Sequence, residues 1–205
     1  DIQVTPLSYA HDGEYLWRCA GLYVWKADAA LVQIFTNQGI VGIAEGSPYR
    51  GPDRLKAYTD QYITPLLKGQ NVFDVDLLTN NQGHNSVAEG AWAGVNNALW
   101  DIIGKAKGIP VYKLLSHEEN PSSQVKIYAS GGVEHTWYDS GEHYLIEEAL
   151  RYKEQGYDAF KFRCGTDWQG AGMTFANHIP ILQRLRQAVG ADFRLVHEAV
   201  GTLGG

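Results

Sequence analysis

Two kinds of hydrophobic periodicity divide the chain. Near its start, apolar residues are concentrated in residues 2–9, 30–36 and 40–45, which predicts three β-strands. Residues 37–39 (Asn-Gln-Gly) supply a tight turn, so the second and third strands are expected to form a hairpin. Because Pro6 lacks a backbone N–H, it places the first strand at a sheet edge or a bend.

Apolar residues then recur at helical spacing. One run predicts a helix that ends at Gly69 and contains Leu55, Tyr58, Tyr62 and Leu66. The strongest run covers residues 86–106, where a wide apolar face rich in small residues permits close helix packing. Gly108 and Pro110 end this helix, and a short helix is expected over residues 111–115.

The polar segment 116–123 is typical of a linker, and a different pattern follows it. Strands are predicted over residues 125–129, 159–163 and 193–197, and helices over 145–156 and 175–190. We expect Pro180 either to kink the second helix or to lie in its first turn. Strand, helix, strand, helix, strand predicts parallel βαβ units with right-handed crossovers. The pattern leaves open a small sheet with bare edges or the start of a (β/α)₈ barrel, which needs about 250 residues.

Composition and charge narrow the function classes. The chain has 205 residues and a net charge of -6, which argues against a nucleic-acid partner. No apolar run approaches the ~18 residues that cross a bilayer, and no signal peptide is recognisable, so no membrane partner is expected. Two cysteines, Cys19 and Cys164, cannot build a disulfide framework, which favours a cytoplasmic setting.

Candidate chemistry gathers where the predicted parallel strands end. Lys161 and Arg163 are two residues apart on one strand and share a face. If that face is buried, two cations require an anionic ligand or carboxylates, whereas on an exposed face the pair carries no meaning. A neighbouring cation lowers a lysine pKa toward neutrality, so Lys161 is a candidate base, but an arginine keeps its proton.

Glu198 ends the third strand of this region and is a candidate oxygen ligand for Mg²⁺. A capping or salt-bridged role for the same carboxylate stays open. His197 precedes it and should point to the other side of the strand, with a structural role as the alternative to a place in the site.

The segment between the first two strands, residues 11–26, is rich in aromatic and charged side chains, including Tyr15 and Trp17. One interpretation is a lid over a site. The other is that its rings cover the surface of their own domain.

Four runs of sequence resemble the enolase superfamily, and within it the mandelate racemase and muconate lactonizing enzyme group. They are GIVGIAEGSPY (residues 39–49), AGVNNALWDIIGKAKGIPVYKLL (93–115), GYDAFKFRCG (156–165) and QRLRQAVGADFRLVHEAV (183–200). The second run resembles the family's helix signature. The third resembles the strand where the family commonly has a Lys-x-Lys pattern.

The resemblance implies an α+β capping domain over residues 1–120, followed over residues 121–205 by the first two and a half βα units of an incomplete parallel (β/α) barrel. It implies Mg²⁺ and abstraction of the proton next to a carboxylate, giving a metal-stabilised enediolate. Lys161 matches the first lysine of the motif, Arg163 the second, where the family usually has a base, and Glu198 the first metal ligand, usually Asp.

The resemblance also assigns candidate substrate contacts. Tyr15, Trp17, Tyr49 and Arg50 match cap loops that close over substrate, and His197 is a further candidate contact. We expect a small-molecule carboxylate as substrate and a homo-oligomer as the assembly.

Arg163 in the place of a base decides the reaction that we expect. Racemisation needs bases on both faces of the carbon, whereas dehydration needs one base and one acid, so a sugar-acid dehydratase (a hydro-lyase) is predicted. A racemase, epimerase or cycloisomerase, and a non-catalytic relative or binding module, are the alternatives. We expect the chain to be a partial one that is inactive alone, with the base supplied by Lys161 or by residues beyond 205.

Overall fold

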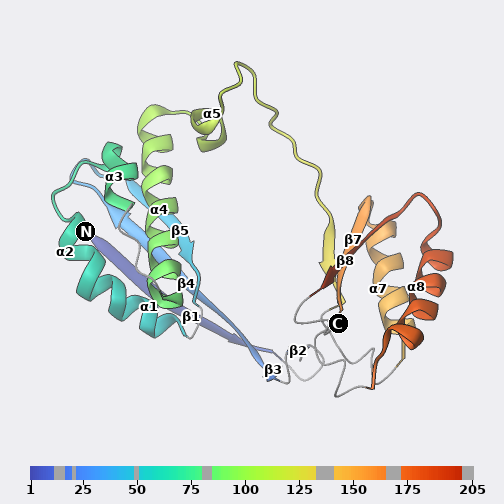
Figure 1. Cartoon of the computed structure of the whole chain (residues 1–205). Coiled ribbons are helices and arrows are strands. Elements are labelled where there is room, and N and C mark those ends of the chain that lie inside the picture. Colours follow the sequence, from blue (N-terminus) through green and yellow to red (C-terminus); the bar gives the residue numbers. More distant parts are fainter. Residues whose placement is uncertain are drawn as a thin grey trace. The chain divides into compact units, whose positions relative to one another are not determined.

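The chain divides into two compact units in a computed structural model (Figure 1). Unit 1 comprises residues 1–9 and 26–123, and unit 2 comprises residues 10–25 and 124–205. The structure describes residues 1–11, 17–19, 22–48, 51–79, 85–132, 141–164 and 172–199. For residues 17–19, 22–23, 77, 164 and 199 it describes the backbone alone.

Unit 1 contains a three-stranded sheet in the order β1-β4-β5, formed by β1 (Ile2–Ala10), β4 (Lys26–Phe35) and β5 (Val41–Gly46). The predicted hairpin is confirmed, because β4 and β5 pair antiparallel with Val32 opposite Ala44. Gly39 has a φ of 82°, which a turn of this kind needs and which glycine adopts without strain. The edge position predicted for the strand with Pro6 is also confirmed.

The helical part of unit 1 follows the sheet. Its elements are α1 (Pro52–Tyr58), the π-helical turn η2 (Thr59–Ile63), α2 (Thr64–Leu67), the 3₁₀ turn η3 (Val72–Asp74), α3 (Val75–Thr79), α4 (Ser86–Lys107) and α5 (Val111–Leu115). The helix predicted to end at Gly69 is thus three consecutive helical elements. The sequence pattern did not predict η3 and α3. Asn85 caps α4 by accepting from two backbone N–H groups, and Gly108, with φ 64°, ends it as expected.

Helix α4 packs against β5 at a spacing that excludes side chains at several glycines (Figure 1). A Cβ at Gly94 would lie 2.7 Å from the Cα of Gly46, and one at Gly42 would overlap the carbonyl oxygen of Ala98. Apolar side chains of the helix and sheet, among them Val32, Val95, Leu99 and Ile102, form the core beside these contacts. The small residues predicted to permit close packing therefore do so.

Unit 2 contains a three-stranded parallel sheet in the order β6-β7-β8, formed by β6 (Ala129–Gly131), β7 (Ala159–Cys164) and β8 (Arg194–Ala199). The helices are α7 (His143–Glu154) and α8 (Phe175–Val189). A separate antiparallel pair is formed by β2 (Trp17–Cys19) and β3 (Leu22–Val24). The predicted parallel βαβ order is confirmed, whereas closure into a barrel is not part of the described structure.

Two details of unit 2 differ from the prediction. The strand predicted over residues 125–129 is present but shifted along the chain, since β6 begins at Ala129 and residues 124–128 form no strand. With Ala129 opposite Phe160, residues 124–127 would lie opposite residues 155–158, which precede β7 and form no strand that could pair with them. Pro180 lies inside α8 beyond its first turn, so the first-turn alternative is wrong.

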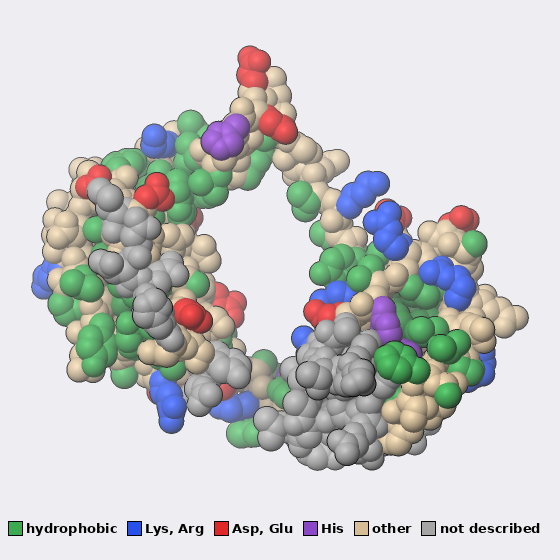
Figure 2. Space-filling view, viewed as in Figure 1, with side chains coloured by type: hydrophobic (Ala, Val, Ile, Leu, Met, Phe, Trp, Pro, Cys, Tyr) green, Lys and Arg blue, Asp and Glu red, His purple; other side chains and the backbone are tan. Residues whose placement is uncertain are grey.

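The described surface carries no continuous patch of one charge on the face seen in Figure 2, where acidic and basic side chains are interspersed on both units. Among the helices of the described ranges, none combines the length and apolarity needed to cross a bilayer.

The α4–β5 contact predicts an unusual result for Gly94→Ala. In an exposed helix this change is stabilising by about 1 kcal/mol, because alanine is the better helix former. At Gly94 the new methyl group would overlap the backbone of Gly46, so we expect the free energy of unfolding to fall by about 1–3 kcal/mol. Urea unfolding followed by circular dichroism measures it, with exposed Asn97→Ala on the same helix as the control. A stabilised Gly94→Ala variant would contradict this packing.

Candidate functional site

The register of the parallel strands determines which polar side chains share a face. Lys161 pairs with Val196 and Arg163 with Glu198, so these alternate residues project from one face of the β7–β8 pair. The residues of β7 that alternate with them, Phe160 and Phe162, are fully buried against α7 and α8. The two cations and the carboxylate therefore lie on the face opposite the helices.

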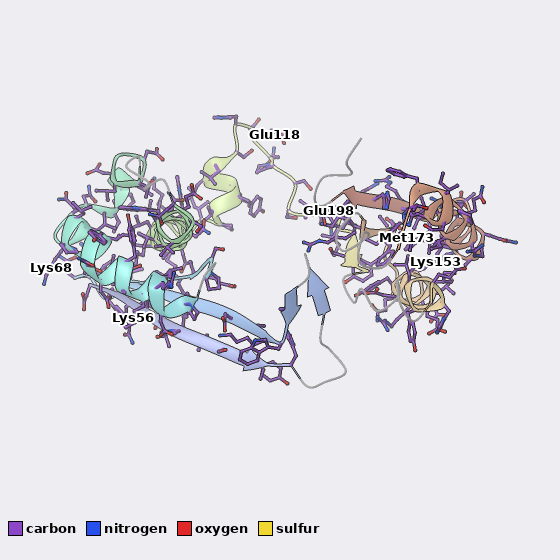
Figure 3. All side chains as sticks on the ribbon, turned by 60° about the horizontal axis from the view of Figure 1, so that its bottom comes forward. Lys56, Lys68, Glu118, Lys153, Met173 and Glu198 are labelled. Carbon is purple, nitrogen blue, oxygen red and sulfur yellow. The ribbon has the colours of Figure 1, made fainter. Side chains whose placement is uncertain are left out.

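Lys161, Arg163 and Glu198 form one ion cluster, with Glu198 on β8 (Figure 3). Lys161 Nζ donates to Glu198 Oε1 at 3.1 Å, and Arg163 Nε donates to Glu198 Oε2 at 3.0 Å. The side chains of the three residues are 19%, 29% and 33% exposed, respectively. The sequence left open whether the cation pair is buried or exposed. In the structure the pair is partly buried and has the Glu198 carboxylate as its counterion.

The charges of the cluster act on Glu198. The hydrogen bond from Arg163, followed by that from Lys161, holds the pKa of the Glu198 carboxyl below its usual range. Glu198 is therefore ionised at neutral pH, and the cluster of two cations and one anion carries a net charge of +1. The ring of Tyr128 lies 5.5 Å from Lys161 Nζ, within the range of a cation–π contact.

His197 lies on the other side of β8, as predicted, and the structure does not bring it to Lys161 and Arg163. Its ring packs on Phe162 at a centroid distance of 4.9 Å, and its Nε2 lies 3.1 Å from Nε2 of His178 on α8. Burial lowers the pKa of His178 from 6.5 to about 4 and also lowers the pKa of His197. Both histidines are therefore neutral at pH 7, and one ring donates to the other.

Two residues of these clusters, His178 and Tyr128, were not predicted from the sequence. His178 lies three and seven residues before the buried Ile181 and Leu185 of α8, a helical spacing that could have signalled a buried histidine. Tyr128 immediately precedes β6, and nothing in its spacing relates it to Lys161.

The remaining predicted substrate contacts are not tested. Tyr15, Tyr49 and Arg50 lie outside the described residues. The backbone of Trp17 pairs with Val24 in the β2–β3 hairpin, and its side chain lies outside the description. Whether the aromatic segment is a lid or a surface covering stays open.

The described residues do not by themselves fit a Mg²⁺ site. A carboxylate is the oxygen donor that Mg²⁺ prefers, and Glu198 supplies one. Both oxygens of that carboxylate, however, already accept hydrogen bonds from cationic side chains. Within the described ranges, no three His, Cys, Asp or Glu residues come together as a metal-binding group.

The chain is similar to known proteins in sequence. Residues 17–116 match the family described as mandelate racemase / muconate lactonizing enzyme, N-terminal domain. The chain is similar to a "D-galactonate dehydratase family member" of Streptomyces sp. (strain SPB074), at 27% identity over 82% of the chain and 43% of the relative. It is also similar to an "Arabinonate dehydratase" of Saccharolobus solfataricus, at 26% identity over 97% of the chain and 53% of the relative.

Solved structures agree on the fold. A member of the enolase superfamily from Polaromonas sp. JS666 is similar with a TM-score of 0.78 and 27% identity, over 96% of this chain and 50% of that one. The 3,6-anhydro-D-galactonate cycloisomerase from Zobellia galactanivorans is similar with a TM-score of 0.71 and 26% identity, over 95% and 49%. The chain spans about half the length of these relatives.

The histidine pair predicts an acid-sensitive unit 2. Because folding lowers the pKa of His178, the unfolded state binds a proton below pH 6.5 that the folded state accepts only near pH 4. The contribution of His178 to stability is therefore complete above pH 6.5 and is lost as the pH falls from 6.5 to about 4. Urea unfolding across this range should show a steeper loss of stability for the wild type than for His178→Leu. Exposed His117→Gln is the matched control, and equal slopes for wild type and His178→Leu would contradict the assignment.

Proposed function

We propose that the full-length protein is a sugar-acid dehydratase. The premise is that this chain belongs to the mandelate racemase and muconate lactonizing enzyme group of the enolase superfamily. Its substrate is a hydroxylated carboxylate such as an aldonate, from which it removes the proton next to the carboxylate and then eliminates water. The names of the relatives support this substrate class at 26–27% identity.

The observation that carries the proposal is the cation pair on β7, where Arg163 lies one residue before the carboxyl end of the strand. Proteins of the α/β class place their ligands at this end of their parallel strands. The proton next to a carboxylate has a pKa far above 7, and its removal gives an intermediate with two negative charges. Fixed cations in a partly dry site lower the free energy of such an intermediate more than water does. Lys161 and Arg163 supply two positive charges on one strand face.

The two cations have different roles in this proposal. Arg163 keeps its proton at any pH at which the enzyme works, so it holds charge and does not act as a base. Lys161 is the candidate base within the described residues: as a neutral amine it accepts the proton from carbon and thereby becomes the second cation beside the intermediate, the alternative base being a residue outside the described ranges. One base and one acid suffice for dehydration, which is why this reaction is proposed ahead of racemisation.

Mg²⁺ is the cofactor that we propose on family grounds, with Glu198 as its contact in this chain. Since both Glu198 oxygens bind cationic side chains, this contact requires the carboxylate to turn away from them. Further ligands are assigned to residues outside the described ranges.

The remaining assignments follow the same premise. Residues 1–120 are proposed as the capping domain and residues 121–205 as the opening βα units of a barrel. Tyr15, Trp17, Tyr49 and Arg50 stay proposed substrate contacts. For His197, which faces α8, a structural role with His178 is proposed in place of substrate contact.

A second candidate function uses the same ion cluster for a different reaction. The similarity to a cycloisomerase favours an isomerase or epimerase, in which the proton returns to carbon and no water leaves. Such an enzyme exchanges the α-hydrogen of its substrate with solvent deuterium and gives no dehydrated product. A non-catalytic relative would do neither.

The test uses the full-length protein with Mg²⁺ and a panel of sugar acids, with 2-keto-3-deoxy products detected by mass spectrometry. We expect turnover of at least one aldonate and a loss of about 10²–10⁴-fold in kcat for Lys161→Ala, the range for removal of a general base. Lys126→Ala, at an exposed residue of the segment before β6, should retain wild-type kcat. Absence of turnover, or turnover that Lys161→Ala leaves unchanged, would refute the proposal.

A further inference from the structure

Glu198 occupies the position in which an external carboxylate would bind. Its two oxygens lie one on each cation, at 3.1 Å from Lys161 Nζ and 3.0 Å from Arg163 Nε. A carboxylate held through both oxygens by two charged donors is the arrangement by which proteins bind carboxylate ligands. The described structure thus shows the cation pair with an internal ligand already bound.

The contact is more protected than an ordinary surface ion pair. The side chain of Lys161 is 19% exposed, and the ring of Tyr128 lies 5.5 Å from its ammonium group. Arg163 and Glu198 are 29% and 33% exposed. Solvent and salt screen such a pair less than a fully exposed one, so the internal carboxylate competes effectively with anions from solution.

The length of the Glu198 side chain makes this double contact possible. Glu198 lies directly opposite Arg163 in the strand register, while Lys161 is two residues before Arg163. One carboxylate must therefore reach two donors from neighbouring positions along β7. An aspartate at position 198 keeps the charge but is shorter by one methylene, so its oxygens reach at most one of the two donors at these distances.

We propose that Glu198 is an internal competitor for the anion-binding position between Lys161 and Arg163. An external carboxylate binds both cations only after the Glu198 carboxylate has turned away. The inference rests on the proposed function in one respect, namely that the external anion is the carboxylate of the substrate. The site therefore exists in two states, closed by Glu198 or open to substrate.

The physical reason for exclusion is charge and space. A second carboxylate at both donors would bring two negative groups within about 4 Å of each other, which disfavours ionisation of one of them. With Glu198 in place, the cluster has a net charge of +1, which attracts an anion to the site. The two oxygens of that anion nevertheless have no free donors, because the Glu198 oxygens already accept from Lys161 Nζ and Arg163 Nε.

The experiment measures binding of malonate to the full-length protein by isothermal titration calorimetry, without metal. We compare the wild type with Glu198→Gln, which removes the competing charge, and Glu198→Asp, which keeps the charge and shortens the side chain. Both variants should bind malonate about 10-fold more tightly than the wild type. Lys161→Ala in the Glu198→Gln background should abolish the gain, which assigns binding to this site.

Three results would show that Glu198 does not compete with external anions. If Glu198→Asp binds malonate like the wild type and only Glu198→Gln binds more tightly, simple charge repulsion explains the result and the inference is wrong. Equal binding by all variants, or binding that Lys161→Ala leaves intact, overturns it as well. Circular dichroism confirms that each variant is folded. Malonate binding is independent of turnover, so a protein without dehydratase activity that shows the predicted order of affinities would refute the proposed function alone.

Discussion

The site depends on one constraint, the parallel pairing of β7 with β8 in a register that puts Arg163 beside Glu198. Alternation along a strand then gives each residue its role. Phe160 and Phe162 face the helices and close the core, so Lys161 and Arg163 must face the other way. The same constraint turns His197 toward α8 and away from the cations. Core packing and site chemistry are therefore two sides of the same two strands.

Much of the fold was predictable because strong local signals coincide with it. The turn at Gly39, the ends of α4 and the βαβ order each follow from periodicity together with a glycine or a cap. The strand predicted over residues 125–129 begins later than expected because a strand needs a partner, and residues 124–127 lie opposite residues 155–158, which form no strand. Local propensity does not contain that long-range information.

The residues of the site, Lys161, Arg163 and Glu198, were predictable from the sequence, but their geometry was predictable only in part. Strand parity alone places Lys161 and Arg163 on one face and His197 away from Glu198. Glu198 is 35 residues from Arg163 and 37 residues from Lys161 in the sequence. Its binding to both cations depends on the register of β7 with β8, which a single sequence does not reveal. The pairing of His178 with His197 depends in the same way on how α8 lies on the sheet.

The most direct measurement is a crystal structure of the full-length protein, determined from crystals grown without added anion and again after soaking in malonate. We expect Lys161 and Arg163 to bind the two oxygens of Glu198 in the first structure. In the second structure we expect malonate at those donors, with the Glu198 side chain rotated away. Lys161 and Arg163 side chains directed apart, or malonate bound while Glu198 keeps both contacts, would show that Glu198 does not compete for this position.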